Sequence, residues 1–559
     1  MRLITFVCLA TSVLFSAQQA SACGGFFCQF TPINQSGEQI VFKQDGDRTT
    51  TMVRIFYSGE ASEFGWVLPV PATPELSVGD DALFNQLEAA TRPQFDLLIT
   101  GSECVDPTRV FEGATLDSSG FPLPVPTAVP SVVIEQSLEV GPFDAQVISS
   151  DSANALALWL ADNNLDLTDR GSELLEPYVN AGMKFVVLKL QSDQAAGDIQ
   201  PIILDYPSTK PVIPITLTSI AAQDDMDVIV WVLGDNRAVP ENFLHVTPNY
   251  TRINWYTGSR NAYASYQTLI TDAMNEAGGQ GFATDYAGSL APFIDQIATA
   301  EQLTANLTPL ADGSAEYIVS AWDFIADPLV FATLQEHLPL PDGQDSSVYG
   351  NTLALATQYT QAELDNAATL LDAAIQEQIV TPRQNAYDLL DDDLYLTRLY
   401  TTLSADEMLL DPSFVFNPDM GDQALVRQAT LNSECTDEGT DWTLTLGEGT
   451  GRTDEIVIDG RGLPPTFFAT APVLEQDASW QIALTKSSGA PEIQTERTFE
   501  IAQVVTFENT PNANAGNGDG TNPIPNTGNT DSGSTGGGGA AYWLSLMGLV
   551  LLMTRKKSS

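Results

Sequence analysis

The sequence predicts an α+β protein with an export signal at its start and an apolar helix near its end. Three regions of different periodicity support this fold class: a mixed α/β region (23–255), a mainly helical region (256–434) and a short β-rich region (435–508). A linker rich in Asn, Gly, Ser, Thr and Pro follows (509–539), and we expect it to be flexible. One apolar helix (540–553) and a basic cytoplasmic end (554–559) complete the expected order.

Residues 1–22 have the pattern of a signal peptide. Arg2 supplies the basic start, residues 3–17 form the apolar core, and the small residues Ala20 and Ala22 suit cleavage by signal peptidase before Cys23. A lipidated Cys23 is the alternative, although Ala20 stands where lipoproteins prefer a larger aliphatic residue. Both interpretations place the mature chain outside the cytoplasm.

The mixed region alternates short apolar runs with amphipathic segments. Asp80 is a plausible cap for a helix over 81–90, and Asp151 or Ser152 for a helix that carries Leu156 and Trp159. Short apolar runs predict strands at 39–43, 50–57, 64–70, 132–140, 145–148, 184–190, 202–206 and 228–233.

The middle region has helical periodicity. Thr360 and Glu363 have the spacing of a capping box, and an apolar stripe from Leu364 to Ile375 follows. Residues 387–400 are also expected to be helical. Strand character then returns at 441–446, 454–458, 480–484 and 498–507.

The C-terminal segment is short for a permanent membrane anchor. Residues 540–553 would form about 21 Å of helix, against a hydrocarbon core of about 30 Å. A glycine run precedes the segment and a basic cluster follows it, and together they comprise Gly536, Gly537, Gly538, Gly539, Arg555, Lys556 and Lys557. This arrangement resembles the GlyGly-type sorting tails that rhomboid-like proteases are thought to process. The alternative is an unprocessed single-pass anchor with its basic end in the cytoplasm.

Cysteine usage agrees with export. Five cysteines become four when Cys8 leaves with the signal, and an even number in an oxidising compartment suggests two disulfides. We favour Cys23 with Cys28 and Cys104 with Cys435, among three possible pairings. A redox role is less favoured because Cys23 and Cys28 lack the two-residue spacing of redox motifs.

The acidic charge excludes some function classes. Residues 23–539 hold 19 Lys and Arg against 72 Asp and Glu, a net charge of about −53. Such a chain repels phosphate backbones, so we expect no nucleic-acid partner. No cofactor or metal site is predicted, since only His245 and His337 are available as histidine ligands. Calcium is the one alternative, at the oxygen-rich loops 44–47 and 516–519, although neither has a complete EF-hand spacing.

Several stretches in fixed order resemble the bacterial domain-of-unknown-function family 2330. They include residues 23–28 (CGGFFC), 64–71 (FGWVLPVP), 230–235 (VWVLGD) and 275–282 (NEAGGQGF), and the resemblance spans roughly residues 23–300. It implies an exported protein, often with a C-terminal sorting tail, and supplies no catalytic residues.

No catalytic motif stands out, and no catalytic residue is predicted. The chain lacks G-x-S-x-G and H-E-x-x-H, and we expect His245 and His337 to be packed or solvated. The leading hypothesis is a non-catalytic protein of the cell envelope, tethered or sorted to the surface, which binds a partner or an external ligand. The alternative is a secreted carboxylate-dependent hydrolase. It requires two acids about 5 to 10 Å apart in a cleft lined by Trp66, Trp159 or Trp231.

Overall fold

The computed structural model describes residues 34–501, apart from 59–63, 102–131, 166–168, 192–198, 254, 256–258, 298, 325–327, 392, 438, 448, 451–454, 459–477 and 498–500. The predicted signal peptide, linker, apolar helix and basic end therefore lie outside the described residues. Among the described helices, none is both long enough and apolar enough to cross a membrane.

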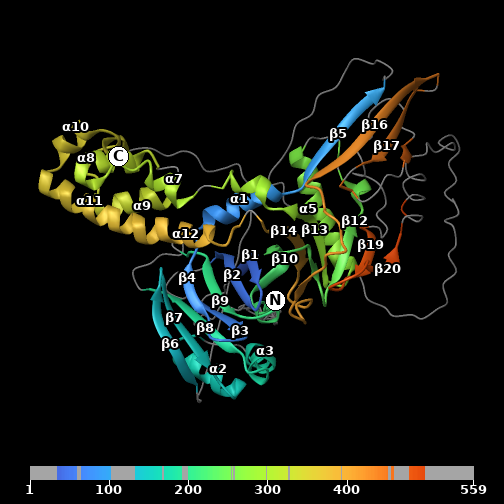
Figure 1. Cartoon of the computed structure of the whole chain (residues 1–559), viewed down its shortest axis with the longest axis horizontal. Helices are drawn as coiled ribbons and strands as arrows, with labels where there is room; N and C mark the ends of the chain where they lie inside the picture. Colours follow the sequence, from blue (N-terminus) through green and yellow to red (C-terminus); the bar gives the residue numbers. More distant parts are fainter. Residues whose placement is uncertain are drawn as a thin grey trace, which may run out of the picture. The chain divides into compact units, whose positions relative to one another are not determined.

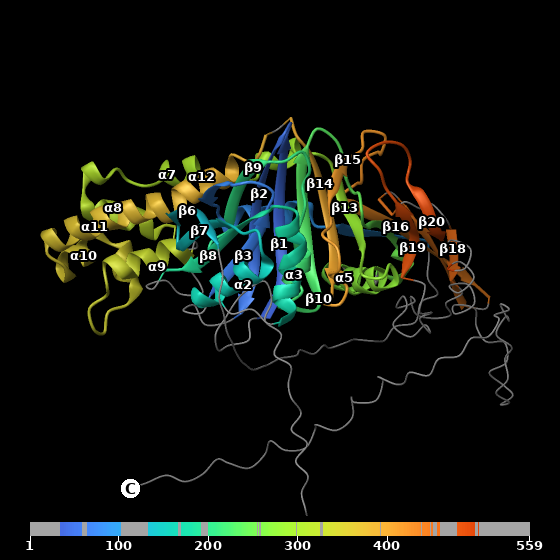
Figure 2. The same ribbon diagram turned by 90° about the horizontal axis from the view of Figure 1, so that it is seen from below.

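The fold is a mixed α+β structure, which confirms the predicted class, and it is built around a ten-stranded sheet that the sequence did not predict. Figure 2 shows the central strands of this sheet side by side. In sheet order, the strands are β20 (Glu492–Glu496), β19 (Ser479–Leu484), β12 (Leu244–Pro248), β13 (Gly281–Ser289), β14 (Tyr395–Leu403), β10 (Ala222–Gly234), β1 (Asn34–Asp45), β2 (Arg48–Ser58), β9 (Ile202–Pro207) and β4 (Glu75–Val78). Strands β1 and β10 pair in parallel, and so do β12 and β13, whereas the other pairs are antiparallel.

Strand β14 corrects the sequence prediction of a helix over 387–400. Helix α12 (Thr381–Tyr387) ends where that helix was expected to begin, and β14 takes a central position between β13 and β10. Eight of the nine residues of β14 are buried. A strand buried on both faces shows no polar alternation, so its apolar and β-branched residues were assigned the wrong period.

A second sheet, with four strands, positions the candidate site. Its order is β3 (Gly65–Val70), β8 (Lys184–Leu190), β7 (Phe143–Ser149) and β6 (Val133–Val140), all antiparallel. Helices α2 (Ala153–Asp162) and α3 (Asp169–Asn180) lie beside it (Figure 1). Leu156 and Leu160 of α2 are buried against Ile148 and Phe185 of the sheet. Ser152 caps α2 by accepting a hydrogen bond from Ala155 N, which settles the choice between two predicted caps.

The remaining strands form two small sheets. One has the order β18 (Glu455–Ile458), β17 (Gly439–Leu446), β16 (Val426–Thr436) and β5 (Gln94–Gly101), and the other pairs β11 (Ala238–Pro240) with β15 (Phe414–Phe416). Two longer helices pack near the large sheet, α1 (Asp81–Thr91) and α5 (Ser259–Glu276). The predicted cap Asp80 is confirmed, since its side chain accepts a hydrogen bond from Ala82 N. Short turns complete this part: α4 (Ile215–Thr218), η3 (Tyr250–Arg252) and α6 (Ala291–Ile294).

A group of helices connects β13 to β14 and has a hydrophobic core of its own. The group comprises α7 (Ala300–Thr304), η5 (Leu310–Asp312), α8 (Ser314–Trp322), α9 (Pro328–His337), η6 (Ser346–Gly350), α10 (Thr352–Gln358), α11 (Gln361–Ile375) and the π-helical turn η7 (Gln376–Val380). The predicted capping box is confirmed, because Thr360 and Glu363 exchange both of its hydrogen bonds. Region 256–434 is thus rich in helices, but it also contains β13, β14, β15 and the start of β16.

Candidate functional site

A pocket of about 450 Å³ opens on the four-stranded sheet beside α2. We call it the Trp159 pocket and define it by Glu139, Asp144, Gln146, Trp159, Asn163 and Lys189. Its volume lies within the usual range of small-molecule sites, about 300 to 1,000 Å³. The side chains that define it combine one large aromatic ring with carboxylate, amide and ammonium groups.

The register of the sheet explains why polar groups gather at this point. Alternate residues of a strand share a face, so Asp144 and Gln146 of β7 lie on the same face as Ile148. Ile148 is buried under α2 and α3, whereas Gln146 is only partly buried and Asp144 is exposed. The face therefore changes from apolar to polar where the cover by the helices ends.

Trp159 stands at this boundary. Leu156 and Leu160 anchor α2 to the sheet, and Trp159 is half-buried at the edge of the same cluster. Asn163 follows α2 and donates a hydrogen bond from Nδ2 to the Trp159 carbonyl oxygen over 2.8 Å. The ring is thus held by a packed helix, with part of its surface open to the pocket.

Two carboxylates lie directly opposite each other beside Trp159. Glu139 of β6 pairs with Asp144 of β7, and both residues are exposed. Directly opposed residues of an antiparallel pair have Cβ atoms about 4.5 to 5.5 Å apart, and like charges there are destabilising. The pocket therefore holds an unfavourable pair of negative charges.

Lys189 offsets part of this charge from the other side. It pairs with Asp144 across β7 and β8, and its Nζ donates a hydrogen bond to the Asn163 carbonyl oxygen. Burial lowers the pKa of the Lys189 ammonium, and nearby Asp144 opposes that shift. One partly buried cation thus faces two exposed carboxylates.

Gln146 adds an unused polar group. Its Oε1 atom is buried and has no hydrogen-bond partner within the described structure. An unpaired buried acceptor costs about 1 to 3 kcal/mol. Because the last torsion of a glutamine side chain is broad, a donor in the pocket could recruit this amide.

A second pocket of about 450 Å³ has a different character. Pro69, Tyr178, Tyr206 and Leu409 are among the mainly apolar side chains that line it. Asp411 is the one carboxylate among the residues that line it, and this side chain already accepts hydrogen bonds from Tyr178 Oη and Thr216 N. This pocket offers no comparable set of polar groups.

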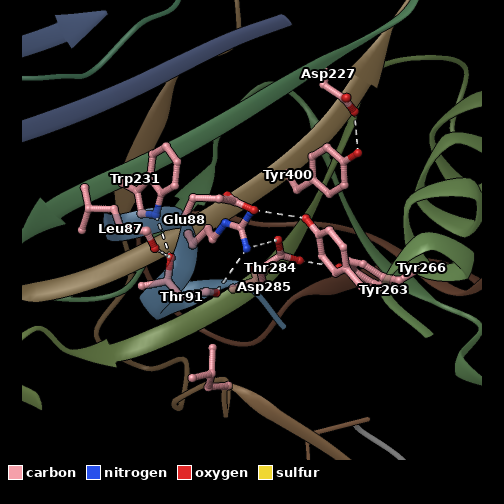
Figure 3. Close-up of polar contacts among 12 residues, drawn as sticks. Leu87, Glu88, Thr91, Asp227, Trp231, Tyr263, Tyr266, Thr284, Asp285 and Tyr400 are labelled. Atoms are coloured by element: carbon pink, nitrogen blue, oxygen red, sulfur yellow. Dashed lines mark hydrogen bonds and ion pairs between the residues drawn. The ribbon is translucent and has the colours of Figure 1, made fainter. Parts of the chain in front are cut away.

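A buried charge network lies elsewhere, between α1 and the large sheet. Figure 3 shows Glu88, Asp285, Tyr263 and Tyr266 within it. Arg398 of β14 is fully buried and forms ion pairs with Glu88 and Asp285, the latter over 3.3 Å. Tyr266 donates to Asp285, and Tyr263 donates to Glu88 over 3.3 Å.

This network contains the two acids and the tryptophan that a carboxylate hydrolase requires, but it is filled by protein. The Arg398 guanidinium stands between the two carboxylates and lies 5.6 Å from the Trp231 ring centre. Trp231, Arg398 and Asp285 have no exposed surface. Burial raises the pKa of the Asp285 carboxyl, and Arg398 opposes that shift. We interpret the network as structural: it holds α1 against strands β13 and β14, and we call it the Arg398 network.

Of the three tryptophans that the hydrolase hypothesis names, only Trp159 lines a described pocket. Trp66 is 5% exposed and belongs to the core between the sheets, and Trp231 is buried in β10.

His245 lies in β12 and contacts Thr284 Oγ1 through Nε2 over 3.0 Å. His337 ends α9. Neither histidine lines the Trp159 pocket.

The predicted disulfide and sorting residues fall mostly outside the described part of the chain. Cys435 lies in β16, whereas Cys23, Cys28 and Cys104 lie outside the described residues, so the predicted pairing stays a prediction. The sorting residues Gly536, Gly537, Gly538, Gly539, Arg555, Lys556 and Lys557 lie outside it too.

One of the two calcium candidates lies within the described residues. Residues 44–47 comprise the end of β1 and the turn before β2, where Gln44 donates hydrogen bonds to the carbonyl oxygens of Gly46 and Arg48. These oxygens therefore already have a donor. Within the described residues, no group of three or more Asp, Glu, His or Cys side chains could hold a metal ion. Loop 516–519 lies outside them.

Sequence reasoning identified Trp159 but missed Glu139, Asp144, Gln146 and Lys189. The only signal was the change from apolar to polar residues along one face of β7 and β8, which needs the register of both strands. It also missed Arg398, because residues 387–400 were expected to form a helix and not a central strand with a buried charged residue.

Comparisons with known proteins give a family and no activity. Curated proteins provide no match. A crystal structure of baculovirus P35 shares 11% sequence identity with a TM-score of 0.19, covering 38% of this chain and 78% of P35, a likeness too weak to support an argument. Residues 17–336, more than half of the chain, match a family of uncharacterized proteins conserved in bacteria. The chain therefore belongs to the DUF2330 family.

Proposed function

We propose that this protein is an exported, non-catalytic binding protein of the cell envelope, and that the Trp159 pocket takes a small polar ligand from outside the cell. The observation that carries the proposal is a half-buried tryptophan in a pocket that also contains carboxylate, amide and ammonium groups. An aromatic ring offers a flat apolar surface, and the polar groups fix orientation by hydrogen bonds. Hydroxylated rings such as sugars present both complementary features.

Export is the second part of the proposal. The signal-like residues 1–22, the glycine run and apolar segment at 536–553, and the basic residues after it support routing to the envelope. The even number of cysteines that remains once residues 1–22 are removed agrees with an oxidising compartment. Signal peptidase and a rhomboid-like sorting protease are the processing partners that we propose. The acidic composition argues against a nucleic-acid partner.

Cys104 is the partner that we propose for Cys435. Strands β5 and β16 run parallel with Gly101 opposite Ser433, so Cys104 lies three residues beyond one member of this pair and Cys435 two residues beyond the other. Mass spectrometry of the protein isolated from its native envelope tests both the proposed export and the proposed pairing of Cys104 with Cys435. We expect a mature N-terminus at Cys23 and a peptide that joins Cys104 to Cys435. Protein in the cytosol with Met1 attached and reduced thiols would contradict the export proposal.

The binding test uses the purified full chain and a panel of mono- and disaccharides, read by calorimetry. We expect millimolar to micromolar binding of some members and at least a tenfold loss in Trp159→Ala, because that change removes the aromatic surface. Asp151→Asn is a matched control, since Asp151 is exposed beside α2 and does not line the pocket. Failure of every sugar to bind, or equal binding by Trp159→Ala, would contradict the proposal.

A hydrolase is the second candidate, and the Glu139 and Asp144 pair favours it by its close spacing. The same pair also argues against it, because glycosidases keep their acid catalyst in an apolar, desolvated setting, whereas both residues are exposed. Incubation with the sugars that bind separates the two functions. We expect the sugars to be recovered intact. Cleavage that disappears in Glu139→Gln would establish the hydrolase instead.

A further inference from the structure

We infer that the ligand of the Trp159 pocket carries a positive charge, and that its class is an amino sugar with a free amine. This inference rests on the proposed binding function of the same pocket. It adds a claim about ligand charge that the binding proposal does not need.

The first argument is the balance of donors and acceptors in the pocket. Glu139 and Asp144 can only accept hydrogen bonds when ionised, and Gln146 Oε1 is an acceptor without a partner in the described structure. Lys189 is the one cationic donor among the pocket residues, and its Nζ already donates to the Asn163 carbonyl oxygen. A ligand rich in donors would satisfy these acceptors, whereas a carboxylate or phosphate would add to the surplus of negative charge, since two carboxylates and one ammonium line the pocket.

The second argument is electrostatic. The opposed carboxylates repel each other, and a cation placed between them would replace that repulsion with two attractions. The whole chain has a formal net charge of −49, so its general field also favours cations and disfavours anions. An anionic sugar is therefore the least suitable ligand for this site.

The third argument is the position of Trp159. A cation within about 6 Å of a tryptophan ring is attracted to its face, most strongly where water is partly excluded. The half-buried ring of Trp159 and the two carboxylates line one pocket, so an ammonium group and the apolar face of a sugar ring could be bound together. A simple amine would lack the second contact, and a neutral sugar would lack the first.

The test compares five probes by calorimetry at pH 6.5 with chelator present: glucosamine, glucose, N-acetylglucosamine, glucuronate and ethanolamine. Glucosamine should bind at least tenfold more tightly than glucose and N-acetylglucosamine, and glucuronate should not bind measurably. Ethanolamine should also be weaker than glucosamine. High salt should reduce the advantage of glucosamine, because a partly exposed charge pair is screened.

Variants assign the effect to the pocket. In the double variant Glu139→Gln with Asp144→Asn, glucosamine affinity should fall to that of glucose, while glucose affinity changes little. Asp151→Asn should behave like the unmodified chain, and thermal melting confirms that each variant is folded. Equal affinity for glucose and glucosamine, or full glucosamine binding by the double variant, would overturn the charge inference and leave the binding proposal standing. Absence of binding by all five probes would overturn the charge inference, and only failure of the wider sugar panel would also remove the binding proposal.

Discussion

Glu38 is a carboxylic acid in the interior of the large sheet. It lies on β1 between β2 and β10, it is 5% exposed, and Gln35 Nε2 donates to its Oε2 over 3.2 Å. Desolvation raises its pKa to about 7, and the hydrogen bond from Gln35 opposes that shift only in part. An acid of this kind prefers to be neutral in the folded state.

The sign of the resulting pH dependence follows from the direction of this shift. Between pH 4.5 and about 7, the unfolded chain releases the Glu38 proton while the folded chain keeps it, so stability falls as pH rises. Below pH 4.5 the Glu38 proton causes no loss of stability. Above pH 7 the loss in the free energy of unfolding is complete and amounts to about 3 kcal/mol. Glu38→Gln should therefore raise the free energy of unfolding by up to about 3 kcal/mol at pH 8 and by little at pH 4.

Urea unfolding at pH 4 and pH 8 measures this effect. The exposed Glu176 of α3 supplies a matched control, and Glu176→Gln should change stability by less than about 0.5 kcal/mol at either pH. A Glu38→Gln variant that is less stable than the unmodified chain at pH 8 would show that the carboxylate is needed in its ionised form.

His245 produces the opposite slope. Burial and nearby Arg237 lower its pKa to about 3, so stability is present above pH 6.5 and is lost as pH falls toward 3. Between pH 4.5 and 6.5 the two residues oppose each other. The Glu38→Gln variant should therefore show a steeper loss of stability in acid than the unmodified chain.

At the scale of elements, the Arg398 network fastens α1 to β13 and β14. Arg398→Met would leave the buried Asp285 carboxylate without its cation, and such losses cost about 3 to 5 kcal/mol. Glu88→Gln should cost less, because the Glu88 side chain is 25% exposed. Replacing Asp285 by Asn in addition to Arg398→Met should recover part of the loss.

Urea unfolding measures the stability of these variants, and sugar binding is the second readout. If the Arg398 network has only a structural role, every variant that remains folded should have a lower free energy of unfolding and an unchanged sugar affinity at the Trp159 pocket. If Arg398→Met lay within about 1 kcal/mol of the unmodified chain, the network would not hold α1 in place.

The same elements show what the sequence can and cannot predict. Caps and short apolar strands were predictable because their signals are local, as the confirmed strands β8 and β9 and the caps Asp80 and Thr360 show. Strand β14 was not, because burial on both faces removes the alternation that identifies a strand. The Trp159 pocket depends on the register of three strands, which no local pattern encodes.

At the scale of the whole molecule, the family match ends inside the helical group and before β14. Residue 336 lies in α9, whereas the large sheet needs β14 at 395–403. The helical group leaves and returns to the sheet at one point, since Ser289 pairs with Tyr395 and Leu290 N donates to Leu394 O over 3.0 Å. Its core is formed by its own residues, among them Tyr317, Leu334 and Leu371.

Two deletions should therefore have opposite outcomes. A chain that stops after residue 336 should fail to fold, because β13 and β10 lose the strand between them. A chain in which a short Gly-Ser linker replaces residues 305–380 should fold, because α7 and α12 remain and lie in contact. Near-ultraviolet circular dichroism and cooperative urea unfolding distinguish the two cases. A folded chain ending at 336 would show that β14 is dispensable.

The late position of β14 in the sequence has a consequence during synthesis. Two parts of the large sheet precede β14 in the sequence: the strands β4, β9, β2, β1 and β10, and the pair β12 and β13. No strand of the sheet yet lies between these two parts. Roughly a hundred further residues must emerge after β13 before β14 can pair with both β13 and β10. During that interval the chain displays apolar strand edges to its surroundings, so a holding chaperone should be required until residue 403 has emerged where the protein folds.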